Sequence, residues 1–168
     1  MCDILIVKGG RYIVSDKAKE REKQIKKLQQ NLSSIRKIAG WTAEVLGDKI
    51  GVTKQTISNL ENQKTPMNFT QYIAIRSVID AEIESNKDNE VLPKVVALLL
   101  DSDDELDEDD YSKVQDVVGT VAATAAGGTP TAKLDSVFDI LIKSIPFVVP
   151  IIGAIIGGST SWSKKLLK

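Results

Sequence analysis

Hydrophobic residues recur every three or four positions along most of the chain, a spacing that predicts a mainly α-helical protein. The first long helix is predicted at residues 17–39, and Gly40 is placed to end it. Helical patterns then continue to about Ser85, where a polar break at residues 86–89 follows. Beyond this break the pattern predicts further helices at residues 91–100 and 114–126 and within the apolar segment 134–168.

The pattern changes at the N-terminus, where β-branched and aromatic residues at 4–7 and 12–14 flank Gly9-Gly10. A glycine pair readily takes the positive φ values of a tight hairpin turn, so residues 1–16 are predicted to form a short β-hairpin. Ser15 or Asp16 can cap the helix that follows. An isolated hairpin is marginally stable, so we expect it to pack on another surface or on a second copy.

Residues 42–62 predict two short helices joined by a tight turn. Thr42 and Thr53 are placed as N-caps of the two helices. Gly47 is small where the helices cross, and Gly51 occupies the turn position that needs a left-handed backbone. The residues predicted to face the core are Val45, Leu46 and Ile50 on the first helix, Val52 in the turn, and Ile57 and Leu60 on the second.

The remaining surface of the second helix is polar, which suits the major groove of DNA. Gln and Asn side chains can pair with adenine through two hydrogen bonds, and Lys can donate to guanine. These side chains are Lys54, Gln55, Thr56, Ser58, Asn59 and Asn62.

Residues 29–82 resemble the Cro/CI repressor family, also called XRE-like, and the match is continuous from Thr42 to Ser58. The second-helix motif of the family is present from Thr56 through Glu61 to Lys64. The resemblance implies a lambda-repressor-like helical DNA-binding domain and a structural ion pair between Arg36 and Glu61. It also implies base contacts from Lys54, Gln55 and Asn59, with Thr56 and Ser58 nearby, and phosphate contacts from Thr53, Asn62 and Lys64.

Two positions depart from the family pattern, since Ala43 stands where many members carry Gln and Gln63 replaces the common Gly. A second interpretation stays open, in which the helix-turn-helix binds protein instead of DNA. The basic residues of the preceding helix also have two interpretations, a solvated face or extra phosphate contacts; they are Arg21, Lys23, Lys26 and Lys27.

Charge is distributed unevenly along the chain. Residues 1–79 carry 14 Lys/Arg and 7 Asp/Glu, whereas residues 80–168 carry 8 and 16. The basic half suits a polyanion, and we expect the acidic half to face away from it.

The chain has no His and a single cysteine, Cys2, so the usual general base and the commonest metal ligand are missing and no multi-Cys zinc site can form. No nucleophile is paired with a base, and we expect neither an enzyme nor a metal or cofactor site. The N-terminus lacks the pattern of a signal peptide, which favours a cytoplasmic protein.

Two segments of the C-terminal half stand out. Residues 101–110 hold eight carboxylates and predict a solvated linker or loop; they lack the Gly and the terminal Glu of a calcium-binding EF-hand. The second segment begins at Ile145, ends at Gly158 and is apolar throughout. At 14 residues it is shorter than a membrane-spanning helix. It can be a helix buried in a core or a dimer interface, or a tail that contacts a membrane.

The predicted organisation is a hairpin at 1–16, a Cro/CI-type domain at 17–85, a short helix and acidic linker at 86–113, and an apolar helical region at 114–168. The predicted function is sequence-specific DNA binding by a homodimeric transcription regulator, a repressor. The alternative is a membrane-associated scaffold that binds protein through its helix-turn-helix.

Overall fold

The computed structural model describes residues 4–7, 11–14, 16–102, 105–146, 148–157 and 162–167, and it is mainly α-helical, as predicted. The helices are α1 (Asp16–Ile38), α2 (Ala43–Ile50), α3 (Lys54–Glu61), α4 (Phe69–Ser85), α5 (Val91–Val96), α6 (Glu108–Ala126), α7 (Thr131–Ile142), α8 (Val148–Gly157) and α9 (Trp162–Leu167). A π-helical segment, η1 (Ala97–Asp101), continues α5.

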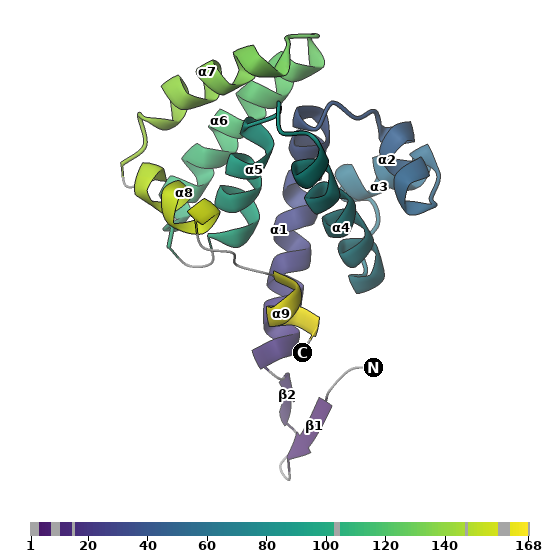
Figure 1. Ribbon diagram of the computed structural model, residues 1–168. Helices are drawn as coiled ribbons and strands as arrows, with labels where there is room; N and C mark the ends of the chain where they lie inside the picture. Colours follow the sequence, from purple (N-terminus) through teal and green to yellow (C-terminus); the bar gives the residue numbers. More distant parts are fainter. Residues whose placement is uncertain are drawn as a thin grey trace.

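Two strands, β1 (Ile4–Val7) and β2 (Arg11–Val14), precede the helices and pair antiparallel, with Ile4 opposite Val14. The pair lies beyond the first turn of α1, outside the helical body (Figure 1). Cys2, the Gly9-Gly10 turn and Ser15 lie outside the described residues.

Helix α1 runs through the middle of the molecule, with α2 to α4 on one side and α5 to α8 on the other (Figure 1). One hydrophobic core joins the two sides and extends from Leu28 to Leu166. The core therefore crosses the boundaries predicted near residues 85 and 113.

A partly buried polar network, centred on the buried Asn31, links α1 to α6 beside this core. The Asn31 amide donates to the Lys27 carbonyl at 2.7 Å and to the Tyr111 hydroxyl at 3.0 Å, and it accepts from Gln115 at 3.0 Å. The Tyr111 hydroxyl donates to the Leu99 carbonyl at 3.1 Å. Because a buried amide is costly when unpaired, this network fixes how α6 sits on α1.

The prediction of a solvated linker or loop at residues 101–110 is wrong at the two ends of the run, where Asp101 and residues 108–110 are helical. Glu105 and Asp107 lie outside the helices and are exposed. Asp101 ends η1 and pairs with Arg76 at 2.7 Å. Asp107 caps α6 by accepting from the Asp110 amide at 2.8 Å, and α6 begins at Glu108. Carboxylates are favoured in a first helical turn by the helix dipole, which offsets their mutual repulsion. Residues 103–104 lie outside the described residues.

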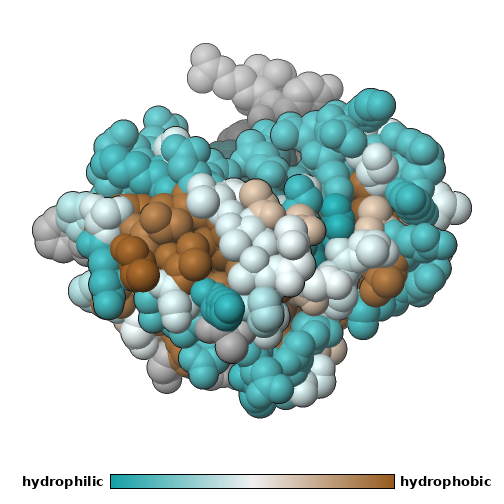
Figure 2. All heavy atoms as spheres, turned by 90° about the horizontal axis from the view of Figure 1, so that it is seen from above, coloured by the Kyte–Doolittle hydropathy of each residue, from teal (hydrophilic) through white to brown (hydrophobic). Residues whose placement is uncertain are grey.

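The C-terminal apolar segment is only partly buried. Ile145 and Val148 belong to the core, whereas Val149 and Ile156 on α8 are 52% and 50% exposed. Figure 2 views the molecule from the α7 side and shows a hydrophobic area among hydrophilic atoms. Within the described ranges, no helix has the length and apolar character needed to cross a membrane. Phe147 and Gly158 are not among the described residues.

Replacing Tyr72 by phenylalanine is expected to raise the free energy of unfolding by about 1 kcal/mol, because the Tyr72 hydroxyl is buried without a hydrogen-bonding partner among the described residues. Burial raises the pKa of Tyr72 from 10.0 to about 12, although Arg76 acts in the opposite direction. Above pH 10 the unfolded tyrosine therefore loses its proton before the folded one, and the wild type loses stability as pH rises. Urea unfolding at pH 8 and pH 11 should show the advantage of the variant widening; an advantage that shrinks would contradict this account.

Candidate nucleic-acid interface

The turn between α2 and α3 has the predicted geometry. The Thr42 hydroxyl accepts from the Val45 amide at 3.1 Å, and Gly51 has a left-handed backbone with φ of 74°. A side chain at Gly47 would place its Cβ 2.6 Å from the Val52 carbonyl oxygen. Glycine at position 47 therefore lets α2 approach the backbone that leads into α3.

The predicted burial of Val45 is wrong, since this side chain is 40% exposed. Leu46 is buried, and Ile50 and Val52 are partly buried against the core. The buried residues of α2 are Leu46 and Gly47, and Val45 lies about 100° around the helix from Leu46, on the side turned away from Gly47, where it is partly open to solvent.

Helix α3 is held at both ends and along its inner face. The Thr53 hydroxyl accepts from the Thr56 amide at 3.2 Å and caps the helix, while Ile57 and Leu60 are fully buried. The predicted ion pair is confirmed: Arg36 contacts Glu61 at 2.5 Å (Nε to Oε1) and 3.1 Å (Nη2 to Oε2). The orientation of α3 is thus set by packing and by a two-point contact with α1.

The eight residues predicted to contact DNA lie together on α3, at its N-cap Thr53 and in the turn that follows the helix. The best exposed of them are Thr53, Lys54, Gln55, Asn62 and Lys64, and the half-exposed ones are Thr56, Ser58 and Asn59. This surface is polar and carries two lysines and no carboxylate of its own. It can offer both hydrogen-bond donors and acceptors to another molecule.

Three amide side chains on this surface already make hydrogen bonds within α3 and its C-cap. Gln55 donates to the Asn59 side-chain oxygen at 2.9 Å, and Asn62 donates to the Ser58 carbonyl at 2.8 Å. The first pair leaves the Gln55 oxygen and the Asn59 nitrogen available. The second leaves only the acceptor oxygen of Asn62.

The end of α3 explains why glycine is common after this helix. The Lys64 backbone amide donates to the Asn59 carbonyl, and the Gln63 backbone amide donates to the Leu60 carbonyl. These two bonds form a Schellman motif in which Gln63 occupies the left-handed position, with φ of 55°. A residue other than glycine is disfavoured in this conformation, because its Cβ lies too close to the following carbonyl oxygen.

Replacing Gln63 by glycine is expected to raise the free energy of unfolding by about 0.5–1 kcal/mol, the left-handed penalty minus the extra flexibility of glycine when unfolded. Gln63→Ala keeps the Cβ and should leave stability nearly unchanged. Thermal unfolding of the two variants beside the wild type measures the difference; a destabilised glycine variant would show that the position carries no strain.

Gln29 on α1 is a residue that sequence reasoning missed. Its side-chain nitrogen donates to the carbonyls of Leu60 and Thr65 at 3.0 and 2.7 Å, and its oxygen accepts from the Met67 amide at 2.9 Å. These three bonds hold the loop that carries Lys64. A glutamine on a polar helix has no local signal for such a role, because its partners are more than thirty positions away in sequence.

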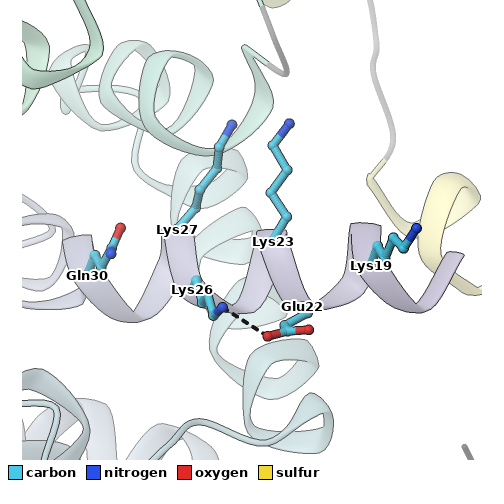
Figure 3. A pocket seen from close by; sticks show the side chains of 6 residues that line it. All are labelled: Lys19, Glu22, Lys23, Lys26, Lys27 and Gln30. Carbon is cyan, nitrogen blue, oxygen red and sulfur yellow. Dashed lines mark ion pairs between the residues drawn. The ribbon is translucent and has the colours of Figure 1, made fainter. Parts of the chain in front are cut away.

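The basic residues of α1 make contacts within the chain. Lys26 pairs with Glu22 at 2.9 Å, Lys27 lies over the Tyr111 ring at 5.6 Å, and Arg21 donates to the Leu166 carbonyl at 3.2 Å. In Figure 3, Lys23 and Lys27 point to one side of α1 and Lys26 to another, around a hollow of about 420 Å³. These contacts favour an intramolecular role over extra phosphate contacts for this helix.

A comparison with known families agrees with this geometry. The family described as Helix-turn-helix matches residues 32–84, from the middle of α1 to the end of α4. No curated protein and no solved structure matches the chain. The resemblance to Cro/CI-type, XRE-like proteins is thereby confirmed. The chain therefore carries, in residues 32–84, a Cro/CI-type helix-turn-helix domain, which indicates a DNA-binding transcription regulator.

Proposed function

We propose that the protein is a sequence-specific transcription regulator that inserts α3 into the major groove of its operator. The observation that carries this proposal is the polar outer surface of α3, on a helix whose inner face is buried and whose orientation is set by the Arg36–Glu61 pair. A rigid scaffold with an exposed polar face is what direct base readout requires.

The amide pair on α3 favours an adenine contact. With Gln55 donating to Asn59, the free Gln55 oxygen can accept from the adenine 6-amino group and the free Asn59 nitrogen can donate to N7. The pairing keeps both amides in place before DNA binds, which reduces the entropy lost on binding. Lys54, in the first turn of the same helix, would donate to guanine or to a phosphate, with Thr56 and Ser58 nearby.

Phosphate contacts are proposed at the two ends of α3. The Thr53 hydroxyl is used as a cap, so at this end the backbone amides and the positive helix terminus would attract a phosphate. At the other end Lys64 would supply a positive charge, and Gln29 would keep its loop in position. The Asn62 nitrogen donates to Ser58 in the free protein and would have to exchange this bond for a phosphate.

Repression is the simplest outcome of such binding, since occupying the operator requires no further contact with the transcription machinery. The proposal includes a homodimer on two half-sites about one helical turn apart, the usual arrangement for helix-turn-helix proteins. It includes no catalytic step.

The proposal is tested by selecting bound sequences from a pool of random duplex DNA and measuring their affinity at several salt concentrations. We expect a selected sequence motif and binding that weakens as salt rises, because lysines displace counterions from phosphates. Failure to enrich any motif, with no binding in dilute buffer, would reject the proposal.

A second candidate function is a scaffold that contacts a membrane surface. The observation that favours it is α8, which has no polar residue and exposes Val149 and Ile156. Sedimentation with anionic liposomes tests it: wild-type protein should pellet with the lipid, and a Val149→Glu, Ile156→Glu variant should stay in solution. Equal behaviour of the two proteins would reject this function.

A further inference from the structure

A cavity of about 350 Å³ lies where the end of α4, the start of α5 and α8 meet. Each of these helices contributes an apolar side chain to its lining: Ile83 from α4, Pro93 from α5 and Ile156 from α8. Sites for small molecules are typically concave and mostly apolar with a few polar groups, and this volume is at the lower end of their range. Ile83 lies within the family-matched residues and Ile156 lies outside them, so a molecule in the cavity would contact both parts of the chain.

Hydrogen bonds hold the polar part of the lining in place. Asn89 is 3% exposed, its side-chain nitrogen donates to the Ile38 carbonyl at 2.8 Å, and its oxygen accepts from the Leu92 amide at 3.2 Å. The Asn86 side chain donates to the Glu82 carboxylate at 3.0 Å. These bonds fix the loop between α4 and α5, so the cavity is formed before any molecule binds and little order has to be gained on binding.

Two lysines line the cavity, and one of them is neutralised within the protein. The Lys94 ammonium donates to Asp135 at 2.6 Å and to Asp139 at 3.0 Å, and both carboxylates are on α7. Because these partners hold its charged end, Lys94 offers the cavity mainly the methylene groups of its side chain. Lys94 therefore adds to the apolar part of the lining.

Lys87 is the lining lysine whose charge is available to a bound molecule. It is exposed, and in the described part of the chain its ammonium makes one contact, a 3.1 Å hydrogen bond to the Ile83 carbonyl. An ammonium has three N–H groups, so two can still donate. The lining also includes the exposed Glu90, whose negative charge opposes a doubly charged group such as a phosphate more than it opposes a single carboxylate.

We propose that this cavity binds a small monocarboxylic acid with a short apolar tail. The tail would lie against Ile83, Pro93 and Ile156, and the carboxylate would accept hydrogen bonds from Lys87. Ile156 is 50% exposed, so a tail in the cavity would cover apolar surface that is now in contact with water. Binding of the acid requires no DNA, and so this inference does not depend on the proposed function.

The location of binding is tested by titrating the full-length, isotope-labelled protein with hexanoate and following its amide signals by two-dimensional NMR. We expect saturable shifts for the signals of residues 83–92 and 156, while the signals of α3 stay unchanged. Shifts that never saturate, or that centre on residues away from the cavity, would overturn the proposal.

Two variants test the two ends of the site. Lys87→Ala should weaken hexanoate binding about tenfold, because a hydrogen bond between charged groups is lost, and it should leave the binding of 1-hexanol, a neutral probe with the same tail, unchanged. Ile156→Ala should weaken the binding of both probes about fivefold, because it removes part of the apolar lining. The same spectra show whether each variant is folded.

The matched controls are Lys133→Ala, at an exposed lysine on α7, and Val149→Ala, at an exposed valine on α8. Neither residue lines the cavity, so both variants should bind the two probes like the wild type. A Lys87→Ala variant that keeps full affinity for hexanoate, or an Ile156→Ala variant that keeps full affinity for both probes, would contradict the assignment. Equal losses in Val149→Ala and Ile156→Ala would show that the probes bind the surface of α8 instead of the cavity.

Discussion

Replacing Glu61 by alanine is expected to lower the free energy of unfolding by about 3–5 kcal/mol. The Arg36 and Glu61 side chains are only 12% and 11% exposed, and their two contacts join α1 to the end of α3. Removing the carboxylate leaves the Arg36 guanidinium poorly hydrated and without its counter-charge, although its bond to the Trp41 carbonyl at 2.7 Å remains. Urea unfolding followed by circular dichroism measures the loss.

Three further variants separate the cost of an unpaired charge from that of a lost side chain. Glu61→Gln keeps one acceptor and should lose less stability than Glu61→Ala. The double variant Arg36→Met, Glu61→Leu removes both charges and should cost far less than the single alanine change. Glu84→Ala, at an exposed site on α4, should change stability by less than about 0.5 kcal/mol. A Glu61→Ala loss as small as this would show that the pair does not hold α3.

Replacing Gln55 by alanine is expected to weaken binding to the selected operator about 5- to 150-fold, which corresponds to the 1–3 kcal/mol of a two-bond base contact. Gln55 is exposed at the first turn of α3 and holds the Asn59 side chain at 2.9 Å, so the change removes one base contact and releases the other amide. Gel shifts with the operator and with a duplex changed at the adenine measure the effect. The variant should also discriminate less between these two duplexes.

The matched control is Gln30→Ala, an exposed glutamine on α1 outside the proposed interface, which should bind DNA like the wild type. Lys64→Ala provides a different signature, because loss of a phosphate contact weakens binding to all duplexes and reduces the salt slope by about 1. If Gln55→Ala binds the operator as tightly as the wild type does, the base contacts must lie elsewhere.

The helix-turn-helix was predictable because its requirements are local. Gly51 and Thr53 form hydrogen bonds with backbone groups only a few positions away, and Gly47 is needed because α2 lies close to the backbone that leads into α3. The contact between Arg36 and Glu61 was predictable only through the family resemblance, since 25 positions separate the two residues. The eight residues of the proposed interface are also close in sequence, and the fold brings them onto one surface.

The failed predictions have more than one cause. The carboxylate run predicted a solvated linker, but Asp101 pairs with Arg76 on α4, 25 positions away, and residues 108–110 form the first turn of α6. Val45 was predicted to be buried because it has apolar neighbours on the same helix. Which of these residues is buried depends on how α2 is oriented relative to the core.

The amino-acid order by itself determined the mainly helical character, the caps and turn around α2 and α3, and the polar outer surface of α3, because propensity, capping and periodicity act within one or two turns. Only the tertiary structure decided that one core unites both halves, that Gln29 holds the loop after α3, and that Trp162 lies against Tyr72. Such contacts depend on which surfaces meet after the chain has folded back on itself, and no local pattern encodes that choice.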